Sequence, residues 1–117
     1  MPRRVLIIDD NDAFRAAARQ LLERAGFVVV AEAGTGGKGI EQAQTHRPDL
    51  AIIDLQLPDC DGFAVAARLP ASVPVILISS LDSTDFGALV ASSSALGFIP
   101  KAELSAAAIE ALLAPAH

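Results

Sequence analysis

Acidic residues follow two apolar runs of this chain, at the points where the runs end. Asp9 and Asp10 come after residues 5–8, and Asp54 comes after residues 50–53. Apolar runs rich in Val, Leu and Ile are typical of strands buried on both faces of a parallel sheet, where ligands bind beyond the carboxyl ends of the strands. Three carboxylates gathered there would repel one another and raise one another's pKa unless a cation joined them. The pattern therefore predicts a divalent metal site.

A hydroxyl and a single cation stand at matching positions later in the chain. Ser79 follows the apolar residues 75–78, and Lys101 follows residues 97–100. Lys101 is the only Lys or Arg after Arg68. Because the carboxyl ends of parallel strands meet at one edge of a sheet, we expect these two side chains and the three acids to share a crevice.

Strand and helix patterns alternate along the whole chain, which is typical of βαβ units and predicts an α/β fold with a parallel sheet. Five strands are expected at residues 4–8, 27–31, 50–54, 75–78 and 97–100. Five helices are expected at residues 12–25, 38–45, 63–69, 84–94 and 103–113. The fourth helix contains Gly87 and three consecutive serines, so we expect it to be the least stable. The glycine-rich residues 34–37 are taken as a structural loop, because their spacing fits neither a P-loop nor a dinucleotide-binding motif.

Length and composition limit the classes of protein to which the chain can belong. With 117 residues, 52% of them hydrophobic, residues 1–117 are expected to form one globular domain. The sequence contains neither a membrane-spanning stretch nor a signal peptide, and its single cysteine, Cys60, cannot form an intrachain disulfide. We therefore expect a cytoplasmic protein. The net charge of −5 argues against direct nucleic-acid binding by this domain.

Four motifs together make the whole chain resemble the receiver domain of bacterial two-component response regulators. They are the acid pair at residues 9–10, the block DLQLPDCDG at residues 54–62, the hydroxyl after PVILI at residues 74–78, and GFIPK at residues 97–101. We accordingly expect a flavodoxin-like, doubly wound, five-stranded parallel sheet of strand order 2-1-3-4-5 with helices on both faces.

The resemblance implies a phosphoryl-transfer site. Asp54 would be the phosphoacceptor and would attack the phosphorus of a histidine kinase's phosphohistidine. Asp10, Asp54 and the backbone carbonyl of Gln56 would bind Mg²⁺ directly, and Asp9 would act through bound water. Lys101 would pair with Asp54 at rest and with a phosphoryl oxygen afterwards.

The resemblance also implies a switch. Ser79 would hydrogen-bond the phosphoryl group, and Phe98 would rotate, which would change the surface formed by the fourth helix, fifth strand and fifth helix. Gln56 and Leu81 would line the path of the attacking water and tune the lifetime of the phosphoryl group. Such a domain phosphorylates and slowly dephosphorylates itself without turning over external substrates, so whether it counts as an enzyme is a matter of convention.

One departure from the family's pattern bears on the output. Ala102 follows Lys101 where many receivers carry a proline. A small residue there resembles receivers attached to LuxR-type DNA-binding domains, which implies transcription regulation through a C-terminal output domain or a partner protein. Homodimerisation on phosphorylation is compatible with the first and fifth helices or with the fourth and fifth.

Two other functions and a set of structural roles compete with this interpretation. Asp10 and Asp12 superficially match the Asp-x-Asp motif of haloacid-dehalogenase-like phosphatases, but Phe14 stands where that motif needs Thr or Val. A receiver-like module that only binds partners would have lost an acid or the lysine. Taken singly, Asp9 and Asp10 could form a turn and a helix cap, residues 59–62 a turn, Ser79 a cap, Phe98 core, and Lys101 a solvated lysine. The conjunction of all of them at strand ends favours a functional site.

Overall fold

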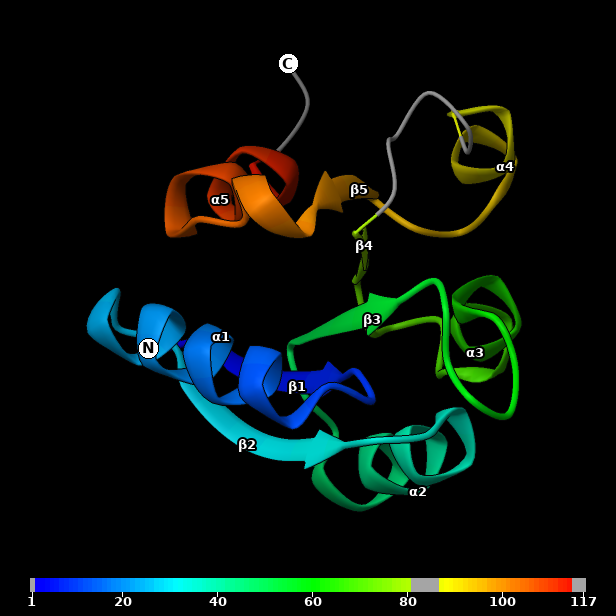
Figure 1. The fold of residues 1–117 in the computed structure, drawn as a ribbon, viewed down its shortest axis with the longest axis horizontal. Coiled ribbons are helices and arrows are strands. Elements are labelled where there is room, and N and C mark those ends of the chain that lie inside the picture. Colours follow the sequence, from blue (N-terminus) through cyan, green and yellow to red (C-terminus); the bar gives the residue numbers. More distant parts are fainter. Residues whose placement is uncertain (1, 81–86, 115–117) are drawn as a thin grey trace.

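The computed structural model describes residues 2–80 and 87–114, in which a central sheet lies between two layers of helices (Figure 1). The strands are β1 (Arg4–Ile8), β2 (Val28–Ala33), β3 (Leu50–Asp54), β4 (Val75–Ser79) and β5 (Gly97–Pro100). They pair in parallel in the order β2-β1-β3-β4-β5. The predicted fold class and strand order are confirmed.

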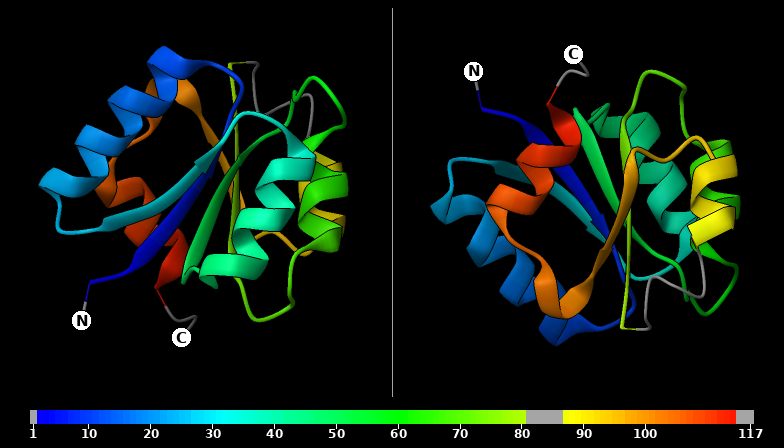
Figure 2. Two further views of the ribbon diagram at one scale, coloured as in Figure 1. Left: turned by 90° about the horizontal axis from the view of Figure 1, so that it is seen from below. Right: turned by 90° about the horizontal axis from the view of Figure 1, so that it is seen from above.

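The helices divide between the two faces of the sheet (Figure 2). They are α1 (Asp12–Arg24), α2 (Gly36–His46), α3 (Gly62–Arg68), α4 (Gly87–Ser92) and α5 (Ala106–Leu113), with a 3₁₀ turn, η2, at Lys101–Glu103. Helices α1 and α5 cover one face, and α2, α3 and α4 cover the other. No helix in the described part of the chain is long and apolar enough to cross a bilayer.

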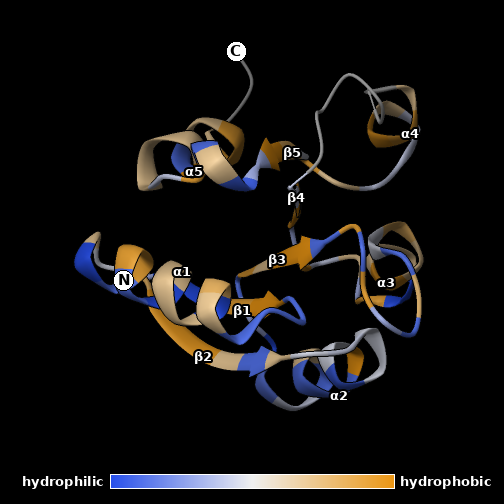
Figure 3. Ribbon diagram, in the orientation of Figure 1, coloured by the Kyte–Doolittle hydropathy of each residue, from blue (hydrophilic) through white to orange (hydrophobic). Residues whose placement is uncertain are grey.

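Side chains of the central strands alternate between two apolar layers. In β1, Val5 and Ile7 pack with α1 and α5, whereas Leu6 and Ile8 pack with α2 and α3. Every residue of β3 and β4 is buried, as expected for strands covered on both faces. Figure 3 shows hydrophobic residues concentrated in the strands and hydrophilic ones in the loop that follows β1. The buried strand β1 is thus followed by a polar loop at its carboxyl end.

Helix α2 begins at Gly36, earlier than the predicted residue 38, and includes two of the glycines assigned to a loop. Thr35 caps it by accepting a hydrogen bond from the N–H of Lys38, at 3.1 Å. The Asp59 carboxylate accepts the N–H groups of Gly36 and Gly37 at 2.8 and 3.0 Å. The predicted boundary was wrong because Thr35 is the N-cap, so Gly36 and Gly37 belong to the first turn of the helix, where Asp59 also binds their N–H groups.

The C-terminal third also differs in its helix boundaries. The helix predicted at residues 103–113 begins later, because Ser105 caps α5 by accepting from the N–H of Ala108 at 3.0 Å, and Glu103 instead ends the 3₁₀ turn η2. Residues 84–86 of the predicted fourth helix lie outside the described residues, and α4 ends at Ser92. Ser93 Oγ donates to the carbonyl of Val90 at 2.7 Å, so a serine competes for the backbone at the helix end.

Candidate functional site

Four neighbouring strands bring charged and polar side chains to one edge of the sheet. Asp9 directly follows β1, Asp54 and Ser79 end β3 and β4, and Lys101 directly follows β5. Asp9 and Ser79 are fully buried, and Asp54 is only 4% exposed. Asp10 is exposed, so the group opens to solvent beside it.

The three aspartates form a carboxylate cluster. One carboxylate oxygen each from Asp9, Asp10 and Asp54 lies within 4.8 Å of the others. Hard oxygen donors with an open, solvated side suit Mg²⁺, which binds through one or two carboxylates, keeps several waters and completes its shell with phosphate oxygen. The donor set therefore fits the metal that the sequence predicts.

The ammonium group of Lys101 bridges two of these carboxylates. Its Nζ lies 2.6 Å from Asp9 Oδ2 and 3.0 Å from Asp54 Oδ2. Burial lowers the pKa of Lys101, but the contacts with both carboxylates outweigh this effect and raise it overall. Lys101 is thus held as a cation at the point where negative charge is concentrated.

Both carboxylate oxygens of Asp54 have partners in the cluster. Burial raises the pKa of Asp54, and the charge of Asp9 adds to this, while the Gln56 N–H and the Lys101 ammonium oppose it. The Gln56 N–H donates to Asp54 Oδ1 at 2.9 Å. Since Lys101 contacts Oδ2, the two oxygens of Asp54 have different partners and the carboxylate is fixed in orientation.

The loop between β1 and α1 is held by Asp9 and Arg15. Asp9 Oδ1 accepts the N–H of Asn11 at 2.8 Å, and Asn11 Oδ1 in turn caps α1 by accepting the N–H of Phe14 at 3.0 Å. Arg15 donates to the backbone carbonyl of Asp9 and pairs with Glu32 on β2 at 3.2 Å. The acid pair is therefore presented by a loop that is tied to both the helix and the neighbouring strand.

The loop between β3 and α3 approaches the end of β3 closely at Gly62. A Cβ atom at Gly62 would lie 2.6 Å from the backbone oxygen of Asp54, so only glycine fits there. Asp61 caps α3 by accepting the N–H of Ala64 at 2.8 Å. The DG pair of the sequence motif thus lets the loop fold back against Asp54.

Other residues predicted for the site lie at its margins. Phe98 is partly buried in β5, where it pairs in register with Leu77 of β4, and Gln56 is exposed after β3. Leu81 lies outside the described residues.

Sequence reasoning missed one aromatic residue beside the cluster. The ring of Phe14 lies over Lys101, with its centroid 4.5 Å from Nζ. The apolar periodicity of residues 12–25 also places Phe14 on the buried face of the first helix, but it gives no sign of a contact with Lys101.

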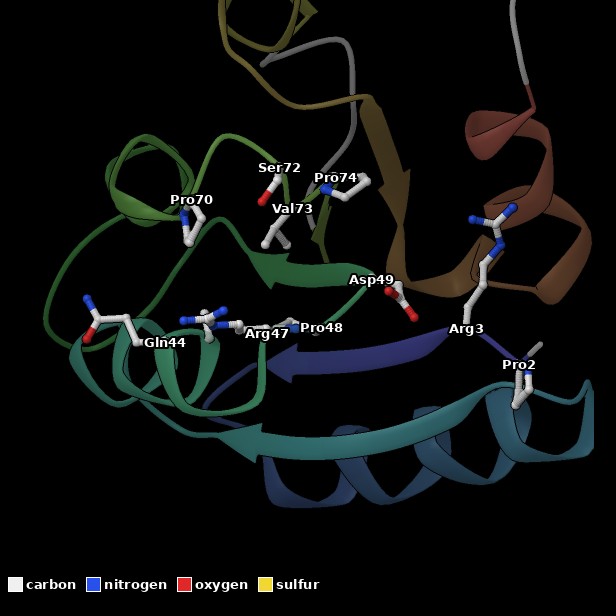
Figure 4. A pocket seen from close by; sticks show the side chains of 11 residues that line it. Pro2, Arg3, Gln44, Arg47, Pro48, Asp49, Pro70, Ser72, Val73 and Pro74 are labelled. Carbon is white, nitrogen blue, oxygen red and sulfur yellow. The ribbon is translucent and has the colours of Figure 1, made fainter.

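A cavity of about 940 Å³ lies at the opposite edge of the sheet, at the amino ends of the strands (Figure 4). Asp49 is the only acid among the described residues that line it, and its Oδ2 accepts the N–H of Arg4 at 2.9 Å. Four prolines contribute to the walls: Pro2, Pro48, Pro70 and Pro74. The described residues that line this cavity include no cluster of acids and cations like the one around Lys101.

Comparisons with known proteins agree with the geometry. The family model of the response regulator receiver domain matches residues 5–113. BvgA of Bordetella pertussis, named as a positive transcription regulator of virulence factors, is 35% identical over 106 residues, which are 88% of this chain and 51% of that protein. The chain spans about half the length of the curated relatives that it matches first.

Solved structures extend the similarity to the fold. A two-component response regulator of the LuxR family from Aurantimonas sp. superposes with a TM-score of 0.87 at 27% identity, covering 97% of this chain and 86% of that one. The signal receiver domain of NarL from Mycobacterium tuberculosis gives a TM-score of 0.82 at 30% identity, covering 97% and 98%. With a family model that spans nearly all of its residues, the chain belongs to the response regulator receiver domain family.

Proposed function

We propose that this chain is a phosphorylation-operated switch of a two-component system, in which Asp54 accepts a phosphoryl group from a histidine kinase. The observation that carries the proposal is the position of Asp54. Its carboxylate is buried, fixed by the Gln56 N–H, and 3.0 Å from the Lys101 ammonium, within a cluster of three acids. A phosphorylation-operated switch is the general role of the family.

The transfer needs positioning and charge neutralisation more than covalent help from the protein. A carboxylate oxygen of Asp54 forms the new bond to phosphorus, the P–N bond of phosphohistidine breaks, and its electron pair leaves with the imidazole nitrogen. Lys101, already held as a cation beside Asp54, would neutralise charge on the phosphoryl oxygens. Orientation of the carboxylate by Gln56 would reduce the reorganisation needed before attack.

Receiver domains generally use Mg²⁺ at their acidic pocket, and the carboxylate cluster supports the same requirement here. We propose that Asp10, Asp54 and the backbone carbonyl of Gln56 hold the ion directly and that Asp9 does so through water. The bound ion would neutralise phosphoryl oxygens during transfer. The Asp9 side chain would keep its contact with Lys101 on the inner side of the cluster.

The response to phosphorylation would pass through β4 and β5. Ser79, buried at the end of β4, would hydrogen-bond the phosphoryl group, and Phe98, which pairs with Leu77 of the same strand, would rotate inward. The surface formed by α4, β5 and α5 would change as a result. Gln56 and Leu81 would tune the lifetime of the phosphoryl group.

We further propose that residues 1–117 are one receiver domain of a cytoplasmic transcription regulator. The name of BvgA and the LuxR-family structure support control of a C-terminal DNA-binding output domain or of a partner protein. Phosphorylation-linked homodimerisation through α1 and α5 or through α4 and α5 is compatible with this role.

Intact mass spectrometry after incubation with acetyl phosphate and Mg²⁺ tests the proposal. We expect the wild type to gain one phosphoryl group that hydroxylamine removes, and Asp54→Asn to gain none. Asp49→Asn, a matched change at the opposite edge of the sheet, should be labelled like the wild type. A wild type that gains no mass with excess donor would favour the module that only binds partners, and full labelling of Asp54→Asn would refute the assignment of Asp54.

A further inference from the structure

Phe14 places an aromatic face against the cation of the carboxylate cluster. The residue lies in the first turn of α1, and its ring centroid is 4.5 Å from Lys101 Nζ. Cations within about 6 Å of a ring centroid are attracted to the negative face of the ring, and partial removal of water strengthens this attraction. The Lys101 side chain is 17% exposed, so this contact is largely shielded from solvent.

Within the described residues, the Lys101 ammonium has three contacts, which differ in what happens to them during phosphoryl transfer. Asp54, 3.0 Å away, is the acceptor in the proposed function and changes its charge on phosphorylation. Asp9, 2.6 Å away, belongs to the carboxylate cluster that would bind a divalent cation. The ring of Phe14 takes part in neither process. The ring is therefore a contact whose own charge stays the same while Asp54 is phosphorylated and the cluster binds a cation.

Lys101 and Phe14 differ in how firmly the fold holds them. Lys101 begins a 3₁₀ turn of three residues, and the next residue, Ala102, is exposed. Phe14, by contrast, is partly buried and packs against the core layer of α1 and α5. The ring is therefore anchored in the core, whereas the lysine extends from a short turn.

We propose that Phe14 is a positioning residue, whose ring holds the Lys101 ammonium beside Asp54 while the lysine exchanges a carboxylate oxygen for a phosphoryl oxygen. The proposal rests on the proposed function. A side chain that only fills space would be replaceable by leucine or methionine, whereas a cation–π contact requires an electron-rich ring.

Stepwise fluorination of the ring separates these two roles, because it weakens the negative face with little change in shape. Monofluoro, difluoro and trifluoro phenylalanine are introduced at position 14 alone, and the rate of labelling by acetyl phosphate with Mg²⁺ is measured. We expect the rate to fall steadily with each fluorine, by about two- to fivefold over the series. This is the fold-change that corresponds to the free energy of a partly shielded cation–π contact. The same series at Phe63, which is also partly buried but packs in the other core layer, should leave the rate unchanged.

Phe14→Tyr and Phe14→Leu extend the test with natural residues. Phe14→Tyr keeps the ring and should retain the wild-type rate, whereas Phe14→Leu should lose as much as the trifluoro variant while staying folded by circular dichroism. NMR provides a readout independent of phosphorylation, because the ring should shift the Lys101 side-chain resonances upfield in the wild type and Phe14→Leu should abolish that shift.

The outcomes distinguish failure of this inference from failure of the proposed function. A labelled wild type with a flat fluorination series, or with no ring-induced shift at Lys101, would overturn the role of Phe14 and leave the phosphoacceptor intact. A wild type that accepts no phosphoryl group would overturn both. A falling series at position 14 with a flat series at position 63 would support the role of Phe14.

Discussion

The two ends of the parallel strands differ in how much buried charge lies beside them. At the carboxyl ends of the strands, Asp9, Asp54 and Lys101 are largely removed from solvent, and the Lys101 ammonium lies within 3.0 Å of both carboxylates. At the amino ends, a cavity of about 940 Å³ is lined by prolines and by exposed polar residues such as Arg3 and Arg47. Buried charge is costly unless it is paired, so its concentration at one edge identifies the functional site better than cavity volume does.

Chain topology explains the difference. Loops at the carboxyl edge lead into helix N-termini, whose free N–H groups attract anions and hold carboxylates such as Asp59. Loops at the amino edge only return the chain to the next strand, and prolines such as Pro48 and Pro74 restrict the backbone just before β3 and β4. Substitutions at the two edges should therefore differ in their effects on stability and phosphorylation.

The largest effect is expected for Lys101→Met. Removing the ammonium leaves two buried carboxylates facing each other, and we expect the free energy of unfolding to fall by about 2–3 kcal/mol. Mg²⁺ should restore part of the loss, because it replaces the missing positive charge. Urea unfolding with and without Mg²⁺ measures both effects. Lys38→Met, at an exposed position of α2, serves as the control, and an equal loss in the two variants would contradict the account.

A smaller effect is expected for Gly62→Ala. The new methyl group would collide with the backbone oxygen of Asp54 at 2.6 Å, so we expect a loss of about 1–2 kcal/mol in unfolding free energy and slower phosphorylation. Gly37→Ala is the matched control, since its methyl group would meet only Asp59 Oδ2 at an ordinary 3.6 Å. Equal stability of the two variants would show that the loop does not press against Asp54.

The pH dependence of stability should have opposite signs for two acids near the site. Burial raises the pKa of Asp54 above its ordinary value, so its ionisation opposes folding, and stability is lost as the pH rises through that raised pKa. The Gly36 and Gly37 N–H groups lower the pKa of Asp59, so its contribution is present above its unfolded pKa and is lost as the pH falls through the lowered one. As the pH rises from about 3 to 7, the stability of Asp54→Asn should therefore increase relative to that of the wild type. Over the same rise, the stability of Asp59→Asn should decrease relative to that of the wild type. Urea unfolding at several pH values checks the signs, and parallel profiles for the two variants would contradict these assignments.

The smallest effect is expected at the amino edge. Arg47 ends α2 with a φ of 46°, in the left-handed region that favours glycine. Arg47→Gly should raise the free energy of unfolding by about 0.5 kcal/mol and leave phosphorylation unchanged. Thermal unfolding and the labelling assay measure the two quantities. A substantial loss of labelling would mean that the cavity edge takes part in the reaction.

The sequence predicted the strands well because their apolar runs are continuous and end in polar residues. Residues 50–54 and 97–100 were placed at their observed bounds. The carboxyl-edge positions of Asp54 and Lys101 followed from this, since parallel strands must end together. The roles of these residues remain predictions.

Contacts between distant segments could not be predicted in the same way. The hydrogen bonds from the Gly36 and Gly37 N–H groups to Asp59 join the first turn of α2 to the loop after β3. The contact of Phe14 with Lys101 joins α1 to the turn after β5, which are neighbours only once the chain is folded. Local patterns carry no information about such pairs.

Locating the phosphoryl group in the wild-type chain tests whether Asp54 is the phosphoacceptor. After labelling with acetyl phosphate and Mg²⁺, borohydride reduction converts an aspartyl phosphate to homoserine, whose position tandem mass spectrometry can identify. The account predicts homoserine at residue 54 alone, between Ile53 and Leu55. Homoserine at Asp10 or Asp49, or at no aspartate in a labelled protein, would contradict it.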